Sequence, residues 1–192
     1  MADIVKKTEE DKIKFAVFSI GTVEFALDIM RIKEIVKPLK ITAIPKAPRF
    51  IEGVINLRGS IIPIVDLRKR FGLKIPETPL PTERIIIARL NGKIIGLIVD
   101  LVSDVISMGK GDICPPPEIV KGVSAQFIKG LGKIGSRLLL LMDLDRILTV
   151  SEKISLKASI KEKSRDKAVK EYEEENTDTS DFIRQAQDTE GE

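Results

Sequence analysis

Two stretches of the first half of the chain reappear in the second half at constant spacing, and this duplication constrains the fold more than any other feature. Residues 26–36 align without a gap with residues 96–106, at an offset of 70. Residues 51–53 and 65–67 align in the same way with residues 128–130 and 142–144, at an offset of 77. A duplicated small-barrel unit of about five strands, paired with its copy across a groove, accounts for both offsets. Two unrelated β-meanders with similar alternation are the alternative.

Two short apolar runs within residues 51–71 flank the tripeptide Arg58-Gly59-Ser60. Each run is rich in β-branched residues, and Gly59 can adopt the positive φ of a tight reversal. The pattern therefore predicts a β-hairpin rather than a buried helix. A helix of one or two turns should follow, with Asp66 as its N-cap and Gly72 as its end.

Arg58, at the tip of this hairpin, has two interpretations. It is either a solvated turn residue or a guanidinium that a rigid hairpin preorganises for a carboxylate of a partner. The duplication favours the second interpretation, because the counterpart of Arg58 is Gly135. The barrel itself therefore does not require arginine at this turn.

The apolar pattern divides the chain into three parts. Residues 1–12 are polar and should be mobile, and residues 13–150 hold the two units. We place the units at about 13–72 and 83–150, with exchange of strands between them left open. Residues 151–192 form a charged tail that should be largely disordered or partly helical, and a docking motif around Phe182 is possible.

Charge and composition limit the classes of function. Residues 1–150 carry a net charge of +7 and residues 151–192 a net charge of −4, which suits acidic partners for the body and solvation for the tail. The N-terminus lacks the apolar region of a secretory signal, and no apolar run is long enough to span a bilayer. With Cys114 as its lone cysteine, the chain cannot form an internal disulfide. A cytoplasmic location is therefore expected.

Reactive side chains are scarce. The sequence contains no histidine, which removes the commonest general base and the commonest metal ligand. Cys114 accordingly has no histidine partner for nucleophilic catalysis, and a zinc site has too few ligands. Carboxylates alone could still catalyse a reaction, but no close pair stands out. We expect no catalytic, metal or cofactor site.

Two other binding functions fit parts of the sequence. Residues 130–135 match the dinucleotide pattern G-x-G-x-x-G, but they lead into an apolar strand rather than opening a helix. Binding of single-stranded nucleic acid by a small basic β-barrel is the serious alternative. Its missing part is a stacking platform, because the chain has no tryptophan, its one tyrosine lies in the tail, and its basic residues are dispersed. The phenylalanines that fall at core-like positions are Phe15, Phe18, Phe25 and Phe71.

Residues 53–68, GVINLRGSIIPIVDLR, resemble the signature of the CheW family of chemotaxis coupling proteins. Residues 25–35, FALDIMRIKEI, and residues 96–105, GLIVDLVSDV, resemble other parts of the same family and occur in the family's order. The resemblance covers about residues 13–150 and leaves out the tail.

The resemblance implies an all-β fold of two SH3-like five-stranded barrels that flank a hydrophobic core, with short helices. It implies a non-enzymatic adaptor that couples the cytoplasmic tip of chemoreceptors to the regulatory domain of the histidine kinase CheA. That kinase domain is itself CheW-like, so pairing between barrels and mixed rings are implied as well. The adaptor would lie at the inner face of the membrane through receptor arrays, without inserting into the membrane or binding nucleic acid.

The family's receptor-facing groove falls on Ile32, Glu34 and Arg58, with Ile95 on the facing lobe. A helical receptor tip needs an apolar floor and a few charges at the rim, and these residue types supply both. Glu34 and Arg58 should also lie close enough to hold the guanidinium in one rotamer. Which of these residues contact the kinase rather than the receptor is left open.

Overall fold

The computed structural model describes residues 12–45, 47–116, 125–149 and Glu152. The predictions of a mobile segment at residues 1–12 and of a disordered or partly helical tail at residues 151–192 therefore lie, apart from Lys12 and Glu152, outside the described residues. The body between them can be compared with the expected duplicated barrel.

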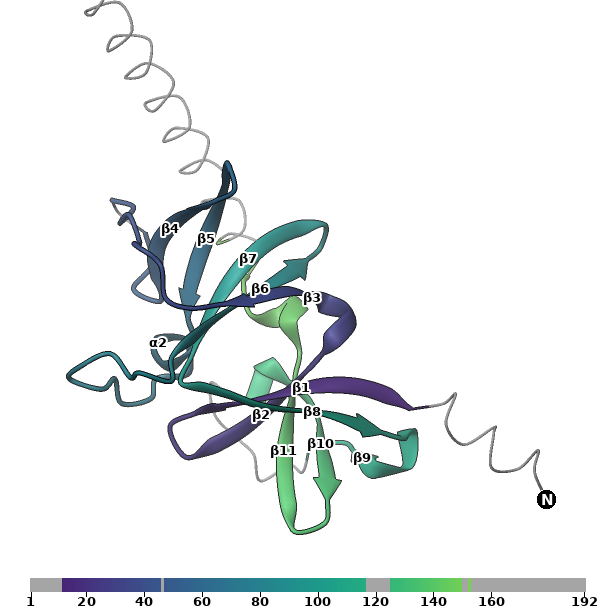
Figure 1. Ribbon diagram of the computed structural model, residues 1–192. Coiled ribbons are helices and arrows are strands. Elements are labelled where there is room, and N and C mark those ends of the chain that lie inside the picture. Colours follow the sequence, from purple (N-terminus) through teal and green to yellow (C-terminus); the bar gives the residue numbers. More distant parts are fainter. Residues whose placement is uncertain (1–11, 46, 117–124, 150–151, 153–192) are drawn as a thin grey trace, which may run out of the picture.

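Strands make up most of the described chain (Figure 1). In chain order they are β1 (Ile13–Ile20), β2 (Val23–Asp28), β3 (Ile32–Val36), β4 (Ile51–Leu57), β5 (Ser60–Asp66), β6 (Arg84–Leu90), β7 (Lys93–Val99), β8 (Leu101–Met108), β9 (Ile113–Cys114), β10 (Ile128–Ile134) and β11 (Arg137–Met142). The helices are α2 (Leu67–Phe71) and the 3-10 helices η1 (Ile29–Arg31), η2 (Lys110–Asp112), η3 (Ala125–Phe127) and η4 (Leu144–Arg146).

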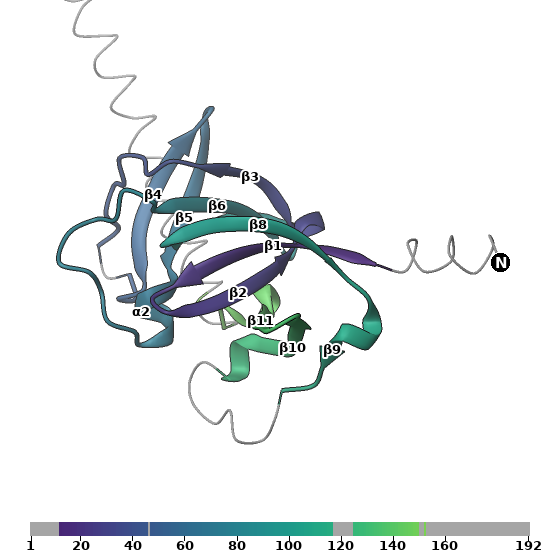
Figure 2. The ribbon, with the colours of Figure 1, turned by 60° about the horizontal axis from the view of Figure 1, so that its bottom comes forward.

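The strands form two sheets, one in each lobe. One sheet has the order β8-β1-β2-β11-β10-β9 and the other the order β3-β6-β7-β5-β4. Figures 1 and 2 show the two sheets as two lobes, with β1 and β2 in one lobe and β4 and β5 in the other. The expected all-β fold of two SH3-like subdomains is confirmed, and the short β9 is a sixth strand that the five-stranded expectation lacked.

The two sheets do not follow the two halves of the sequence. Strands β1 and β2 pair with β8 and β11, and β6 and β7 pair with β3 and β5. Each lobe therefore takes two strands from one half and the remainder from the other half. The contiguous segments 13–72 and 83–150 are thus not the sets of strands that pair within a sheet.

The duplication extends to the register of the strand pairs. Ala26 on β2 lies opposite Leu141 on β11, and Gly96 on β7 lies opposite Ile64 on β5. The same sequence offsets relate the two parallel pairs: Gly96 lies 70 residues after Ala26, and Leu141 lies 77 residues after Ile64. The antiparallel pairs also share a register shift at equivalent places, between Ile51 and Gly53 in β4 and between residues 128 and 130 in β10. The alternative of two unrelated meanders does not account for this agreement.

Gly53 shows why the shift in β4 needs glycine. Its φ is +144°, and a Cβ atom at this position would lie 2.2 Å from the carbonyl oxygen of Thr42. Thr42 and Val54 exchange two backbone hydrogen bonds of 2.8 and 2.9 Å across this contact. The bare backbone of Gly53 thus lets the proline-spaced connection before β4 lie directly against the strand.

Three hydrophobic clusters hold the lobes together. One cluster fills the β1–β2 lobe, a second fills the lobe that contains β4 and β5, and the largest lies between the lobes and takes residues from both. Four rings in the largest cluster stack in series, with centroids 5.3 to 5.8 Å apart; they belong to Phe18, Phe25, Phe71 and Phe127. These rings join β1 and β2 to α2 and η3, so the shared core that the fold prediction included is confirmed.

The local prediction for residues 51–72 is confirmed as well. Strands β4 and β5 form the expected hairpin, and the Asp66 carboxylate accepts hydrogen bonds from the backbone N–H groups of Arg68 and Lys69 at 2.8 and 3.3 Å. Gly72 ends α2 with a φ of +67°. The segment 28–36 is ambiguous between helix and strand in the sequence. In the structure it contains both, the 3-10 helix η1 followed by the strand β3.

Glu152 belongs structurally to the body, although the apolar pattern ends before it. Its carboxylate accepts two hydrogen bonds from the guanidinium of Arg70, at 3.0 and 3.1 Å, and one from the backbone N–H of Thr149 at 2.7 Å. The guanidinium of Arg70 also lies over the rings of Phe50 and Phe127, 4.1 and 5.0 Å from their centroids. The described contacts of the body therefore include Glu152, two residues beyond the expected boundary at residue 150.

Two truncations that differ by two residues test this boundary. A chain that ends at Glu152 should melt at the same temperature as the full chain, because the described core contacts are intact. A chain that ends at Val150 loses the paired carboxylate opposite Arg70, at a cost of about 1–2 kcal/mol. Its Tm should fall by about 2–6 °C in a circular dichroism melt. Equal melting temperatures for the two truncations would contradict the assignment of Glu152 to the body.

Candidate partner-binding groove

Arg58 sits in a backbone conformation that arginine rarely adopts. The two-residue turn between β4 and β5 places Arg58 at a φ of +51° and Gly59 at +83°, and the side chain of Asn56 accepts a hydrogen bond from the N–H of Gly59 at 2.9 Å. The equivalent turn of the other lobe has Gly135 at a φ of +58°. A left-handed conformation costs a non-glycine residue about 1–2 kcal/mol. The chain bears this cost at Arg58 where glycine would satisfy the fold, which points to a function for the side chain.

The predicted pairing of Arg58 with Glu34 is confirmed. The guanidinium donates to the Glu34 carboxylate at 3.1 Å, and the side chain of Arg58 is 79% exposed against 27% for Glu34. A pair this exposed contributes about 0–1 kcal/mol to stability. Its main effect is to hold the guanidinium in one direction over β3.

The other lobe uses an arginine differently. Asp104 is the counterpart of Glu34, and it pairs with Arg137 at 2.9 Å, while Arg137 also donates to Glu24 at 2.7 and 3.2 Å. These hydrogen bonds to Glu24 and Asp104 keep the pKa of Arg137 above its ordinary value. Arg137 is thus committed to two carboxylates of its own lobe, whereas Arg58 holds one and keeps most of its surface open to a partner.

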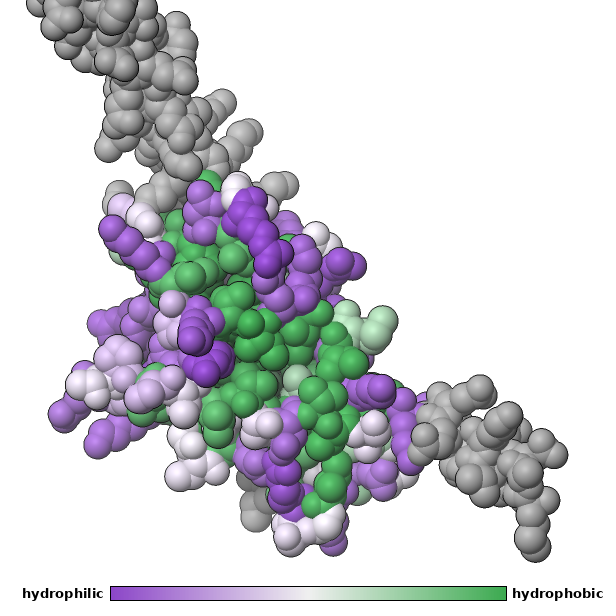
Figure 3. Space-filling model, viewed as in Figure 1, coloured by the Kyte–Doolittle hydropathy of each residue, from purple (hydrophilic) through white to green (hydrophobic). Residues whose placement is uncertain are grey.

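A groove of about 600 Å³ opens beside Arg58, between the β4–β5 hairpin and the β6–β7 hairpin. The side chains that form its floor are mainly branched and apolar, and the charged residues among its lining are Lys33, Glu34, Arg58 and Lys93. Figure 3 shows apolar side chains gathered on this face of the molecule, with hydrophilic residues along their borders. The apolar residues that line the groove are Leu57, Ile61, Ile62, Pro63, Ile87, Leu90, Ile94, Ile95 and Leu148.

The groove brings together three of the four residues that the sequence assigned to an interface. Glu34, Arg58 and Ile95 line it, and Ile95 is buried in its floor. The expectation that Ile95 lies on the facing lobe is wrong, because β7 belongs to the same sheet as β3, β4 and β5. Ile32 does not line the groove but packs, partly buried, against the shared core. In a regular strand, Ile32 and Glu34 would face the same side. The register of β3 shifts between them, so they face different sides. Contact of Ile32 with a partner stays a prediction.

Sequence reasoning missed Lys33, Lys93 and Leu148. Lys93 follows the Asn91-Gly92 turn of the predicted β6–β7 hairpin, so its place at a hairpin tip facing Arg58 could have been inferred. Leu148 comes from the end of the body, and no local pattern places it at the groove. Within the part of the chain that the structure describes, neither lysine makes an ion pair.

Known proteins resemble the chain over the body that contains this groove. The chain matches the family described as CheW-like domain over residues 14–152. It is 37% identical over 152 residues to the probable chemotaxis protein CheW of Rhizobium etli, which covers 79% of this chain and 97% of that protein. The chemotaxis protein CheW of Bacillus subtilis is 38% identical over 136 residues, with 70% and 86% covered. The chain belongs to the CheW family.

A solved CheW structure agrees with the fold. The crystal structure of the scaffolding protein TtCheW from Thermoanaerobacter tengcongensis has a TM-score of 0.69 and 40% identity to the chain, and it covers 73% of the chain and 95% of that protein. The chain is accordingly a chemotaxis adaptor protein of the CheW family. The CheW-like match ends at Glu152, the residue that Arg70 anchors.

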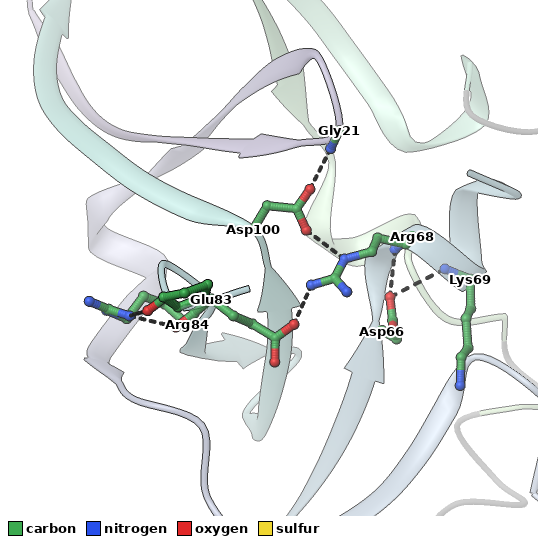
Figure 4. Close-up of polar contacts among 8 residues, drawn as sticks. Gly21, Asp66, Arg68, Lys69, Glu83, Arg84 and Asp100 are labelled. Atoms are coloured by element: carbon green, nitrogen blue, oxygen red, sulfur yellow. Dashed lines mark hydrogen bonds and ion pairs between the residues drawn. The ribbon is translucent and has the colours of Figure 1, made fainter. Parts of the chain in front are cut away.

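A buried ion cluster lies at the opposite end of β5, β6 and β7 from the groove of this CheW-like domain. Arg68 on α2 is 4% exposed and pairs with Glu83 and with Asp100, the latter at 2.5 Å (Figure 4). Asp100 also accepts a hydrogen bond of 2.6 Å from the backbone N–H of Gly21, in the β1–β2 turn of the other lobe. The cluster therefore ties α2 and the link between β7 and β8 to the facing lobe.

The charges in the cluster show opposing effects of burial and pairing. Burial works against the charged form of Arg68, but the hydrogen bond to Glu83 and the charge of Asp100 raise its pKa above the ordinary value. Burial raises the pKa of Asp66, and the N–H groups of Lys69 and Arg68 only partly offset it. Arg68 thus remains charged at neutral pH and needs its carboxylate partners.

The described residues also bear on the functions that the sequence disfavoured. Among them, no group of three or more histidine, cysteine or acidic side chains could hold a metal ion. None of the helices in the described part of the chain has the length and apolar character that crossing a membrane requires. The phenylalanines named as core-like, Phe15, Phe18, Phe25 and Phe71, are all buried, so they offer no stacking platform to nucleic acid.

Proposed function

We propose that the chain is a non-enzymatic coupler whose groove receives the cytoplasmic hairpin tip of chemoreceptors, while a second surface binds the regulatory domain of the histidine kinase CheA. The observation that carries the proposal is the exposed guanidinium of Arg58, held by Glu34 at the rim of an apolar groove. The proposed site of action is cytoplasmic, at the inner face of the membrane where receptor arrays form.

The groove suits a helical partner. An amphipathic helix buries an apolar face in a groove and contacts charges at the rim with its flanking polar residues. The floor supplied by β5, β6 and β7 is apolar, and the rim holds three cations against one carboxylate. A receptor segment with apolar anchors and a carboxylate near Arg58 would match both features.

Pairing with other CheW-like domains is supported by exposed apolar side chains at equivalent positions of the two lobes. Ile35 on β3 is 41% exposed, and its counterpart Val105 on β8 is 64% exposed. Both strands lie at an edge of their sheets. Two similar apolar edges would let one chain contact a CheW-like kinase domain, or another adaptor in a ring, through either lobe.

Reconstitution tests the proposal directly. Membranes that contain a chemoreceptor should activate CheA more strongly when the chain is added than without it. A pull-down should also recover the receptor fragment and the kinase together only in the presence of the chain. No change in kinase activity, combined with binding of single-stranded DNA that weakens steeply with salt, would instead support the nucleic-acid alternative.

A further inference from the structure

The last described residues of the chain follow a residue that lines the groove. Leu148 lines the groove, and Thr149 and Glu152 follow it directly. Thr149 and Glu152 exchange backbone-to-side-chain hydrogen bonds of 2.7 and 3.3 Å, and Arg70 holds the Glu152 carboxylate from the other side. Although burial favours its neutral form, the N–H of Thr149 and the Arg70 guanidinium lower the pKa of Glu152. The start of the tail is therefore fixed to the body at Glu152, four residues after Leu148 in the lining of the groove.

Charge in the tail is strongly divided. The chain continues for 40 residues beyond Glu152, from 153 to 192. Residues 153–170 hold seven cations and two carboxylates. Residues 171–183 hold six carboxylates and no cation, and they end in the apolar pair Phe182-Ile183.

The segment 171–183 complements the groove in both respects. Lys33, Arg58 and Lys93 against Glu34 give the lining a net charge of +2, and neither lysine is paired within the described chain. The acidic run matches this rim, and Phe182-Ile183 matches the apolar floor. We propose that residues 171–183 of the chain itself occupy the groove and compete there with the receptor segment. The competition rests on the proposed function, whereas the contact within the chain does not.

The tether is long enough for this contact. Eighteen residues separate Glu152 from Glu171, and even at the compact rise of a helix the stretch from Glu152 to Glu171 would span about 28 Å, roughly the diameter of a small domain. A ligand tethered by a linker that can reach its site is present at an effective concentration on the order of millimolar. Weak contacts would then suffice to fill the groove for part of the time, and a tighter partner could displace the segment.

Paramagnetic relaxation in the full chain tests the contact without any receptor. The lone cysteine is replaced (Cys114→Ser), and a nitroxide is attached to a new cysteine in the variant Ser180→Cys, next to the apolar pair. We expect the amide signals of groove residues such as Ser60 and Ile94 to lose intensity, while those of β10 in the other lobe keep theirs. The variant Phe182→Ala/Ile183→Ala should restore the groove signals.

Two charge reversals of matched type separate the groove from general electrostatics. Lys93→Glu in the groove should restore the signals, whereas Lys133→Glu, an exposed lysine on β10, should not. Groove signals that stay at full intensity in the parent chain would overturn the proposal. So would a loss that both reversals leave unchanged, or one confined to residues 153–170, because the acidic run would then pair with its own basic neighbour.

A binding measurement connects the contact to the proposed function. The variant Phe182→Ala/Ile183→Ala should bind a receptor fragment about two- to tenfold more tightly than the parent chain, because apparent affinity scales with the fraction of open grooves. If no chain binds the fragment, the proposed function fails while the relaxation result stands. If the fragment binds both chains equally, the competition is wrong.

Discussion

Replacing Arg68 by methionine should lower the free energy of unfolding by about 3–5 kcal/mol, the largest stability effect that we expect from a single change. Methionine keeps most of the length of the side chain, so the loss comes from charge rather than from a cavity. Asp100 and Glu83, whose side chains are 9% and 12% exposed, would remain buried without their cation. Urea denaturation followed by circular dichroism measures the change.

A double-mutant cycle identifies the cause of this loss. Asp100→Asn removes one of the two charges but leaves an amide oxygen to accept the hydrogen bond from Gly21. The pair Arg68→Met/Asp100→Asn should therefore be less destabilised than the sum of the single changes, by about 1–3 kcal/mol. Strict additivity would show that Arg68 acts through its packing and not through the buried ion pair.

A matched surface arginine provides the control. Arg58→Ala should change the free energy of unfolding by less than about 0.5 kcal/mol, because its side chain is 79% exposed and its ion pair is solvated. Arg58 lies at the tip of the β4–β5 hairpin, and Arg68 lies ten residues later on α2. The expected effects on stability differ because Arg68 is buried and Arg58 is exposed.

Local features of the fold could be predicted because a few neighbouring residues determine them. The turn at Arg58-Gly59, the N-cap at Asp66 and the αL end at Gly72 each depend on the conformational preferences of one or two residues. The duplication added long-range information, since the two offsets required that the lobes share one strand pattern. Packing of the phenylalanines followed from the same alternation.

The exchange of strands could not be predicted, because the alternation of each strand is the same whether it pairs within its own half or with the other. Only Asp100 lies between β7 and β8, yet these strands belong to different sheets. A link of one residue cannot return the chain to the sheet it has just left, so the next strand joins the facing lobe. The parallel pairing of β2 with β11 then brings together segments more than 100 residues apart.

The groove was predictable only in part, for a related reason. Resemblance to the CheW family pointed to Glu34, Arg58 and Ile95, and the structure brings these together. The register shift that separates Ile32 from them has no signal in the residue types of β3. Leu148 reaches the groove through the packing of the last described turn, which the local sequence does not encode.

Reversing the charge at Arg58 should abolish kinase coupling while leaving the fold intact. Arginines that are binding hot spots contribute about 2 kcal/mol or more to binding, so Arg58→Glu should weaken receptor binding at least tenfold. The new carboxylate would also face Glu34, which adds repulsion at the same rim. Receptor-dependent kinase activity in reconstituted membranes measures the effect, and Lys133→Glu on β10 serves as the matched reversal that should retain activity.

A charge swap distinguishes contact with a partner from support of the turn. Glu34→Arg/Arg58→Glu restores an ion pair at the rim of the groove but inverts its direction. If Arg58 only stabilises the hairpin, the swapped chain should couple the kinase normally. If Arg58 binds a partner carboxylate, the swapped chain should stay inactive, and an unfolded single variant would point back to the structural interpretation.

Replacing Arg58 by glycine separates stability from function most sharply. Gly135 occupies the equivalent turn of the other lobe at a φ of +58°, close to the +51° of Arg58, so Arg58→Gly should relieve the backbone cost of a left-handed arginine. The free energy of unfolding should then stay equal or rise, while receptor binding falls at least tenfold. A variant that is both less stable and still active would refute the role of the guanidinium, because it would show that the chain keeps Arg58 for its fold.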